Sequence, residues 1–213
     1  MRNSWTDRFL ELALDYQALR FGQFELKSGR VSPYFFNAGL FSDGAGLHEL
    51  AGCYAEAICA SDVPFDMLYG PAYKGIPLAA SIAVRMQTDF GRNLPFAFNR
   101  KEAKDHGEGG TIVGAEIAGR VLIVDDVISA GTSIRESREI IESHGARPAA
   151  VAIALDRQER GLDDRSAVQA VRDSGINVIS VATLNEMLGW LQDQEIAGAD
   201  RSAMLDYQKQ FGV

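Results

Sequence analysis

The chain has 213 residues, of which 46% are hydrophobic and 23% are charged, values typical of a globular protein with one domain or two small ones. Its 29 acidic residues exceed its 21 basic residues and give a net charge of −8, which argues against nonspecific binding to nucleic acid or to an anionic membrane. A local basic site for a small anion is still compatible with this charge.

The sequence contains no pattern of a membrane or secreted protein. No apolar run approaches the ~18 residues of a membrane-spanning helix, and the first ten residues lack a signal-peptide pattern. The cysteines, Cys53 and Cys59, are six positions apart, which places them on different faces of a helix, and no cluster of His and Cys accompanies them. We therefore expect two reduced thiols in the core and a cytoplasmic location.

The first forty residues predict a helix followed by a β-hairpin. An apolar stripe that starts at Phe9 predicts a helix that reaches Arg20. Within residues 21–39, two extended runs are separated by a turn at Gly29. We interpret residues 1–40 as an N-terminal helix and a small hood on a larger domain.

Residues 41–213 alternate between helix-like and strand-like segments. Helices are expected at residues 46–60, 76–86 and 133–144, and short buried strands at residues 66–69, 94–98, 121–124, 149–155 and 178–184. The third helix is expected to begin with a capping box between Ser133 and Glu136 and to end at Gly145. This alternation predicts an α/β fold with a central parallel sheet flanked by helices on both faces. Since ligands bind beyond the carboxyl ends of such strands, the residues after each strand are candidates for a site.

The strongest candidate follows the apolar strand at residues 121–124. Asp125 and Asp126 come directly after it, and a loop of small residues then leads into a helix, whose first N–H groups and dipole favour a phosphate. Carboxylates suit the hydroxyl groups of a sugar, so the two features together predict a site for a ribose 5-phosphate. An ordinary strand–helix turn is the alternative, but two acids at the end of a buried strand are costly to desolvate without a ligand or partner.

Two further segments combine glycines with basic residues. Residues 70–77 follow a strand and place Tyr73 and Lys74 between glycines, which suits a pyrophosphate, although a plain surface turn has the same composition. Residues 100–110 are polar and rich in glycine, and we expect them to form a mobile loop. Their basic and acidic side chains balance, so a solvated surface loop is the alternative.

The segment from Val121 to Ser133 resembles the phosphoribosyl-pyrophosphate (PRPP) signature of the type I phosphoribosyltransferases. Four other segments resemble the hood, the pyrophosphate loop, the mobile catalytic loop and the orotate-contacting segment of the orotate phosphoribosyltransferases, namely residues 24–39, 70–77, 100–110 and 154–161. The likeness extends from the first helix to Phe211. Ser129 is a departure, since the family often has Thr there, but the hydroxyl group is retained.

The resemblance implies the type I phosphoribosyltransferase fold, with residues 41–213 as its core. It implies the reaction of orotate with PRPP to give orotidine 5′-monophosphate and pyrophosphate, a step of pyrimidine biosynthesis. It also implies Mg²⁺ as a cofactor, carried mainly by PRPP near Asp125 and Asp126 without dedicated protein ligands. In the family the mobile loop reaches the neighbouring subunit, which implies a homodimer with shared active sites. A cis peptide bond is expected between Ala72 and Tyr73.

The resemblance also assigns roles to individual residues. The residues implied to be catalytic are Lys104, Asp125 and Asp126. Those implied to bind PRPP are Lys27, Tyr73, Lys74, Arg100, Lys101, Lys104, His106, Asp125, Asp126, Val127, Ile128, Ser129, Ala130, Gly131, Thr132 and Ser133. Those implied to bind orotate are Phe35, Phe36, Ser129 and Arg157.

Some of these roles have simpler alternatives. Phe35 and Phe36 are adjacent aromatic residues, which are more often core, and alternate side chains can serve both purposes. Arg157 is expected to pair with the carboxylate of orotate, whereas a surface ion pair with Glu159 is the alternative.

Two other functions are compatible with parts of the pattern. A phosphoribosyltransferase for another base, such as a purine or uracil, would share the PRPP signature, but the hood and Arg157 argue against it. A PRPP-sensing regulator that binds RNA or DNA would need a basic face, which the charge of −8 does not favour. We therefore expect orotate and PRPP as partners, and neither nucleic acid nor a membrane.

Overall fold

The structure is a computed structural model that describes residues 3–26, 29–104, 110–129, 131–161, 164–194 and 196–213. The strands are β1 Leu19–Glu25, β2 Val31–Phe36, β3 Met67–Gly70, β4 Phe96–Lys104, β5 Gly110–Gly114, β6 Arg120–Val124, β7 Arg147–Asp156 and β8 Asn177–Thr183. The helices are α1 Ser4–Asp15, α2 Gly44–Ala60, α3 Gly75–Phe90, α4 Thr132–Ser143, α5 Ala167–Asp173, α6 Leu184–Trp190 and α7 Arg201–Phe211, with a 3₁₀ turn, η1, at Ala38–Leu40.

The central sheet has six strands in the order β5-β4-β3-β6-β7-β8. The neighbours from β4 to β8 are parallel, as the alternation of strands and helices predicts. The prediction of a parallel sheet is wrong at one edge, where β5 is antiparallel to β4. Only residues 105–109 separate these two strands, and so short a connection can join antiparallel strands but cannot make a parallel crossover.

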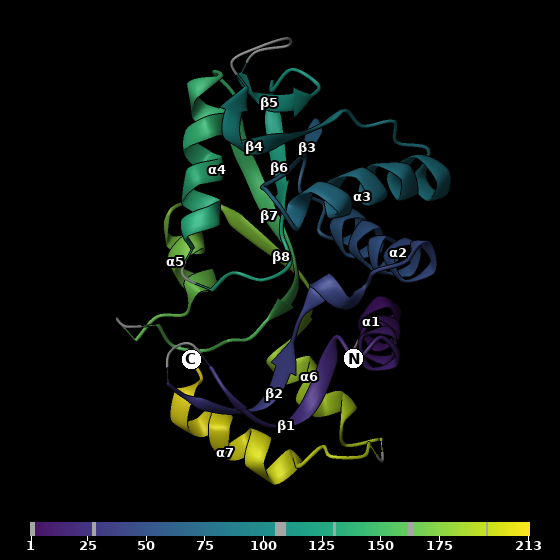
Figure 1. The fold of residues 1–213 in the computed structure, drawn as a ribbon, viewed down its shortest axis with the longest axis vertical. Coiled ribbons are helices and arrows are strands. Elements are labelled where there is room, and N and C mark those ends of the chain that lie inside the picture. The colour runs from purple at the N-terminus through teal and green to yellow at the C-terminus, as the bar shows by residue number, and fades with distance from the viewer. Residues whose placement is uncertain (1–2, 27–28, 105–109, 130, 162–163, 195) are drawn as a thin grey trace.

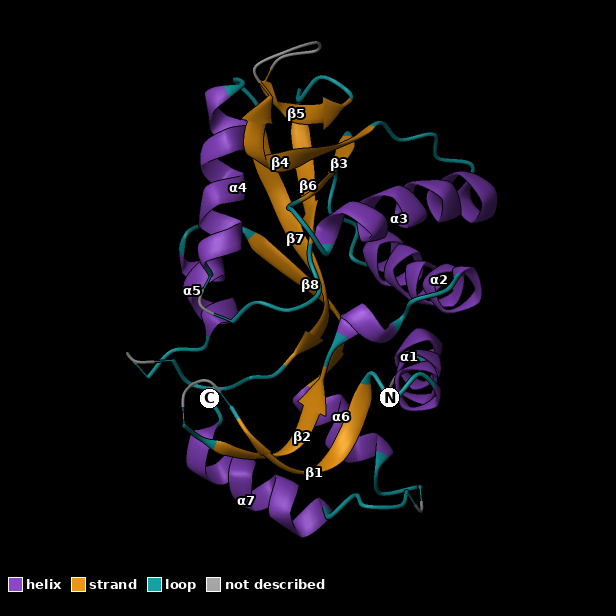
Figure 2. Cartoon of the chain, in the orientation of Figure 1, coloured by secondary structure: helices purple, strands orange, loops and turns teal. Residues whose placement is uncertain are grey.

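Alternate residues of the sheet face two separate cores. In β6, Leu122 and Val124 belong to the core shared with α1, α2 and α3, while Val121 and Ile123 belong to the core shared with α4 and α5. The period of two in a strand produces this division, because successive side chains point to opposite faces. Figures 1 and 2 show the resulting layers, with α2 and α3 on one side of the sheet and α4 and α5 on the other. A strand covered in this way holds its carboxyl end rigidly.

The hood is an antiparallel hairpin of β1 and β2, as predicted. The helix before it ends earlier than predicted, at Asp15 instead of Arg20. Gln17 has a φ of 54°, which no helix accommodates, and Leu19 then lies in β1 opposite Phe36. Leu19 is buried in β1, and a helix would also have placed it on the buried stripe. The apolar stripe therefore could not show that the chain changes direction here.

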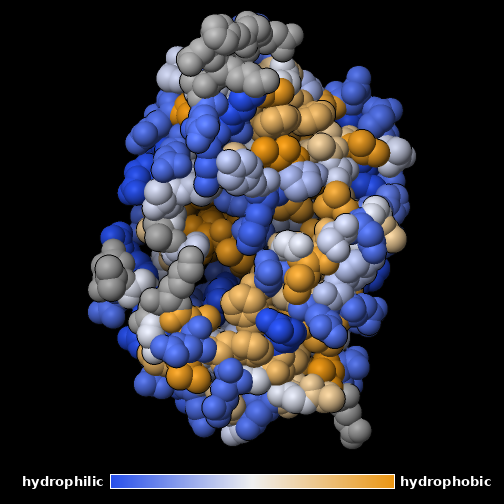
Figure 3. Space-filling view, viewed as in Figure 1, coloured by the Kyte–Doolittle hydropathy of each residue, from blue (hydrophilic) through white to orange (hydrophobic). Residues whose placement is uncertain are grey.

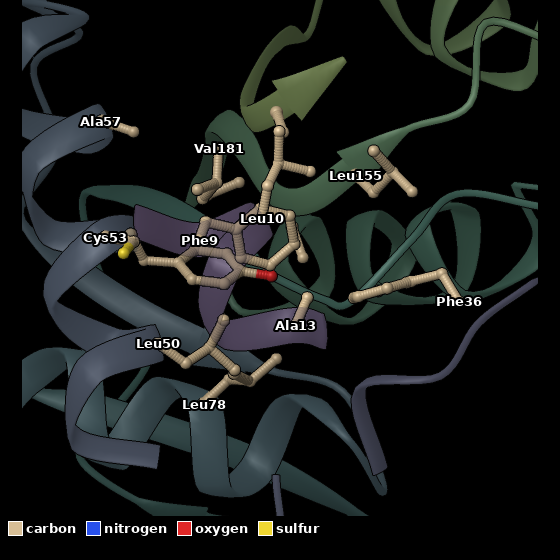
Figure 4. Packing of buried hydrophobic residues seen from close by; sticks show 14 of the residues in the cluster. Phe9, Leu10, Ala13, Phe36, Leu50, Cys53, Ala57, Leu78, Leu155 and Val181 are labelled. Carbon is tan, nitrogen blue, oxygen red and sulfur yellow. The ribbon is translucent and has the colours of Figure 1, made fainter. Parts of the chain in front are cut away.

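The hood shares its core with the sheet. Phe9 of α1 packs edge-on against Phe36 of β2, with ring centroids 5.8 Å apart. Figure 4 shows these two side chains in one cluster with Leu155 and Val181, which come from β7 and β8. On its other side the hood is covered by α7, at the lower end of the view in Figure 1. The hairpin is therefore fixed relative to the carboxyl ends of β7 and β8.

Helices α5, α6 and α7 were not predicted, although two of them begin with a recognisable signal. Ser166 with Gln169 and Thr183 with Glu186 form capping boxes at the starts of α5 and α6. The capping box predicted at Ser133 is absent, because the hydroxyl of Ser133 donates to Asp125 instead. The predicted end of α4 at Gly145 is confirmed by its φ of 76° and by its N–H bond to the carbonyl of Glu142.

Neither cysteine forms a disulfide. Cys53 is buried, as expected, whereas Cys59 is partly exposed at the edge of the core. Within the part of the chain that the structure describes, no helix is both long enough and apolar enough to span a bilayer.

Candidate active site at the carboxyl ends of the strands

The two acids after β6 have a backbone that is held on both sides. The N–H of Asp125 donates to the carbonyl of Ala152 at 3.0 Å, and the carbonyl of Asp126 accepts from the N–H of Ala154 at 2.9 Å, so pairing with β7 continues past the end of β6. From α2, the hydroxyl of Tyr54 donates to the carbonyl of Asp125 at 2.8 Å. Both carboxylates are therefore presented from a fixed position.

The two carboxylates have different partners. Asp125 Oδ1 accepts from the N–H of Asp126 at 2.9 Å, and its Oδ2 accepts from the hydroxyl of Ser133 at 2.9 Å. Asp126 Oδ2 lies 2.5 Å from Nζ of Lys74. Burial and the adjacent charge of Asp126 raise the pKa of Asp125 to about 6, since both disfavour its ionised form. The pair thus concentrates negative charge, which Lys74 offsets in part.

Because ionised Asp125 is buried beside a second negative charge, we expect an Asp125→Asn variant to be more stable than the wild type, by an amount that depends on pH. The pKa of Asp125 is higher in the folded chain than in the unfolded one, so protonation favours folding, and this benefit is lost as the pH rises through about 6. At pH 8 the free energy of unfolding of the variant should exceed that of the wild type by about 2 kcal/mol. Near pH 4 the difference should vanish. Urea unfolding at both pH values measures it, and a difference that does not change with pH would contradict the argument.

A cavity of about 340 Å³ opens beside the acids. It is lined by Ala72, Tyr73, Lys74, Asp125, Asp126, Val127, Ile128, Ser129, Gly131, Thr132, Ser133 and Ile134. Gly131 precedes α4 with a φ of 69°, a conformation that favours glycine, and turns the loop into the first turn of the helix. The cavity therefore places carboxylates, hydroxyl groups and the N-terminus of α4 around one volume. Figure 3 shows a hollow near the middle of this face, with hydrophobic and hydrophilic atoms on its walls.

The loop after β3 forms the opposite wall. The Ala72–Tyr73 peptide bond is cis, as expected. A side chain at Gly75 would lie 2.6 Å from Pro71 and 2.7 Å from the carbonyl of Val124, so glycine is required where the loop passes the end of β6. The N–H of Ala72 donates to Oδ1 of Asn99 at 2.9 Å. This bond attaches the loop to β4.

Two of the predicted cationic residues, Lys74 and Lys101, lie at this wall. Nζ of Lys101 in β4 lies 4.8 Å from the ring centroid of Tyr73, which is 67% exposed. A smaller cavity of about 180 Å³ continues from Pro71 and Ala72 to Lys101 and the first turns of α4. Lys74 and Lys101 thus line two cavities that share Ala72 and Ser133 as wall residues, an arrangement that suits a polyanion more than a single phosphate.

The predicted base-binding residues lie on the hood and after β7. Phe36 is buried in the core, whereas Phe35 is partly exposed beside Phe24, with ring centroids 5.6 Å apart. Arg157 follows β7, three positions beyond the Ala154 that pairs with Asp126. Its guanidinium forms an ion pair with Glu159 at 2.6 Å. The ion pair of the alternative interpretation is therefore present, but it is mostly buried and does not lie on the surface as that interpretation predicts.

Several predicted site residues cannot be placed. Lys27, His106 and Ala130 lie outside the residues that the structure describes, and for Lys104 only the backbone at the end of β4 is described. Arg100 is in β4. The prediction of a loop at residues 100–110 is therefore wrong for residues 100–104, which belong to β4.

Sequence reasoning missed two residues that support the site. Asn99 could have been found, since it is a polar residue near the carboxyl end of an apolar strand. Tyr54 could not, because it lies within a helix that reads as core and reaches Asp125 only through the tertiary fold.

No group of three or more His, Cys, Asp or Glu side chains suited to a metal occurs among the residues described. Asp125 and Asp126 supply oxygen atoms, the ligand type that Mg²⁺ prefers, but Asp126 is paired with Lys74. This donor set fits a magnesium ion that brings most of its ligands with it.

Comparison with known proteins agrees with this geometry. Residues 49–185 match the phosphoribosyl transferase domain family. The chain is 57% identical to the orotate phosphoribosyltransferase of Bordetella avium over 100% of both chains, and 56% identical to that of Pectobacterium carotovorum over 97% of both. The crystal structure of orotate phosphoribosyltransferase from Francisella tularensis superposes with a TM-score of 0.87 at 41% identity, covering 96% of this chain and 99% of that one. The chain therefore belongs to the orotate phosphoribosyltransferases, within the type I phosphoribosyltransferase family.

Proposed function

We propose that the chain transfers the ribose 5-phosphate group of PRPP to orotate, with release of pyrophosphate, and that the cavity beside Asp125 and Asp126 is where this happens. The observation that carries the proposal is the pair of buried carboxylates at the end of β6, between the N-terminus of α4 and Lys74. Hydroxyl groups of a ribose donate to carboxylates, and a phosphate accepts from N–H groups and hydroxyls. A simple anion would use the N–H groups and hydroxyls but would have no use for the carboxylates.

The ribose and its 5-phosphate occupy adjacent parts of the cavity in this proposal. Asp125 and Asp126 accept from the ribose hydroxyls, and the loop from Ser129 to Ser133 donates to the 5-phosphate. The hydroxyl of Thr132 stands at the start of α4, where the helix dipole favours negative charge, and Ser133 donates its N–H, because its hydroxyl already donates to Asp125. Ser129 has a second role toward the base, since it lines the same cavity.

The pyrophosphate lies along the wall formed by the loop after β3. Lys74 and Lys101 are the described cations nearest to it, and Tyr73 contributes its exposed ring edge and the N–H groups of its loop. Arg100, Lys104 and His106 add positive charge from β4 and the segment that follows it, and Lys27 adds it from the hood. Neutralising the leaving group in this way lowers the barrier for departure of pyrophosphate.

The transfer needs no nucleophile from the protein. A ring nitrogen of orotate attacks C1 of the ribose as the bond to pyrophosphate breaks, and positive charge develops on the ribose. The proton of that nitrogen is lost to the departing pyrophosphate or to water. Asp125 and Asp126 stabilise that charge from a position fixed by β7 and Tyr54, so no reorganisation is required at the moment of reaction. Lys74 moves from Asp126 toward the pyrophosphate when the substrate binds.

Magnesium is the proposed cofactor, and it would lower the charge of the pyrophosphate group when bound. Asp125 and Asp126 are the described residues that would face it, directly or through water.

Orotate is proposed to lie between the hood and Arg157. Phe35 offers its ring and Phe36 its backbone, since the ring of Phe36 is in the core. Arg157 pairs with the carboxylate of orotate, the group that distinguishes this base from uracil. We further propose a homodimer with shared sites, a cytoplasmic location in pyrimidine biosynthesis, and no nucleic-acid or membrane partner.

The proposed activity is tested by incubating the chain with orotate, PRPP and Mg²⁺ and following the loss of orotate absorbance. We expect turnover that requires all three components and orotate as the preferred base over uracil and the purines. A chain that consumed PRPP with another base, and not with orotate, would contradict the proposal.

A further inference from the structure

Arg157 is held in the free chain by two contacts, one with Glu159 and one with the ring of Tyr34. Its Nε and Nη2 donate to Oε1 of Glu159 at 2.9 and 2.6 Å, and its guanidinium lies over the ring of Tyr34 at 4.9 Å from the centroid. The hydroxyl of Tyr34 donates to the same oxygen of Glu159 at 3.2 Å. One contact fixes an edge of the guanidinium and the other fixes its face.

The position of Glu159 is in turn determined by the end of the chain. The N–H of Arg160 donates to the carbonyl of Phe211 at 2.7 Å, and the N–H of Val213 donates to the carbonyl of Gln158 at 3.0 Å. Gln158 has a φ of 52° and donates its N–H to Oδ1 of Asp156 at 2.9 Å. The backbone on both sides of Glu159 is therefore tied down, and its carboxylate turns back onto the residue two positions earlier.

Tyr34 is equally constrained. It is completely buried, and the ring of Tyr207 from α7 packs against it edge-on at 6.4 Å. The side chains of Arg157 and Glu159 are only 21% and 14% exposed. An arginine in this environment without an acidic partner would leave a poorly solvated charge, so Glu159 also keeps the guanidinium in place.

The contacts leave one edge of the guanidinium available. Glu159 occupies the Nε side, and the edge between the two terminal nitrogens can still donate two parallel N–H groups to a carboxylate. We propose that Glu159 is a positioning residue that holds Arg157 ready to receive the carboxylate of orotate. This inference rests on the proposed role of Arg157. In this proposal Glu159 orders the side chain of Arg157 before the base arrives. Without Glu159, binding of orotate would have to order that side chain and would be weaker.

The test compares KM values for the two substrates in Glu159→Ala and Glu159→Gln variants. Freeing one long side chain corresponds to roughly a tenfold loss of affinity, so Glu159→Ala should raise KM for orotate about tenfold. KM for PRPP and kcat should stay within about twofold, because neither depends on holding the base carboxylate. Glu159→Gln retains an oxygen that accepts from Arg157 and should lie between the wild type and Glu159→Ala.

A double-mutant cycle with Arg157→Ala separates positioning from a structural role. In the Arg157→Ala background, Glu159→Ala should have no further effect on KM for orotate. The matched control is Glu142→Ala, which removes an arginine contact of similar length, 2.7 Å to Arg138, on the exposed side of α4 and should change neither KM. Unfolding in urea shows whether each variant is folded.

Three results would overturn the inference. An unchanged KM for orotate in both Glu159 variants would remove its role, and an equal effect with and without Arg157 would make that role structural. A lower KM for orotate would mean that Glu159 competes with the base. If Arg157→Ala alone leaves KM for orotate unchanged, the proposed role of Arg157 fails, a result distinguishable from failure of Glu159 alone.

Discussion

Replacing Asp125 and Asp126 together with asparagine should lower kcat/KM for PRPP by about 10²–10³-fold or more, the loss typical of removing one or more electrostatic contacts to a developing charge. Asparagine keeps the size of each side chain but removes the negative charge beside the ribose. Since the backbone of both residues is bonded to β7, the fold should remain intact. Initial rates with varied PRPP and saturating orotate measure the effect.

Asp66→Asn is the matched control for this prediction. Asp66 precedes β3, at the opposite end of the sheet, and forms an ion pair with Arg120 at 2.7 Å on the surface. Its replacement removes one carboxylate charge, against two in the double variant, and should leave the kinetics with PRPP unchanged. Wild-type PRPP kinetics in the double variant at Asp125 and Asp126 would refute their assignment to the ribose.

Lys104→Ala should reduce kcat by about 10²–10⁴-fold while leaving the fold intact. Lys104 ends β4, three positions after Lys101, which lies against Tyr73 at the wall proposed for pyrophosphate. Its ammonium is proposed to meet negative charge that increases as the bond to C1 breaks, so its loss should affect kcat more than KM for PRPP. Steady-state kinetics check this, and near-normal turnover would exclude Lys104 from catalysis.

The same variant tests whether the sites are shared between subunits. A hybrid dimer of one Lys104→Ala subunit and one Asp125→Asn subunit has one intact site if Lys104 acts in the partner's site. Hybrids purified through two different N-terminal tags should then show about half of the wild-type turnover per dimer. Turnover no higher than in either parent dimer would argue for sites contained within one subunit.

The sequence predicted the fold class, and it predicted that two acids stand at the end of a buried strand beside a loop that leads into a helix. Asp125 and Asp126 stand out in the sequence because they follow directly on an apolar strand. Acids at the end of a buried strand are costly to desolvate unless a ligand or partner compensates their charge. The cavity beside them unites the two acids with Tyr73 and Lys74, which are about fifty positions earlier in the chain. The rule that ligands bind beyond the carboxyl ends of parallel strands supplied that connection.

The errors arose where tertiary contacts override a local pattern. Leu19 fits a helical stripe equally well as a residue of β1, and only its pairing with Phe36 decides between them. Ser133 fits a helix cap, but its hydroxyl is used by Asp125. Glu159 was recognised only as a competing partner for Arg157, since its backbone is fixed by residues 211 and 213, which no spacing along the chain relates to it.

Residues 211 and 213 support the segment that carries Arg157 and Glu159. Phe211 and Val213 supply backbone partners of the segment after Arg157, whereas the pairing of β6 with β7 and the backbone bonds of the two acids to β7 involve no residue beyond 156. Synthesis proceeds from the N-terminus, so a growing chain can assemble the strands that carry Asp125 and Asp126 before Phe211 exists. The pairing that fixes the backbone of the two acids is therefore available to a growing chain earlier than the contacts with residues 211 and 213 that fix the segment after Arg157.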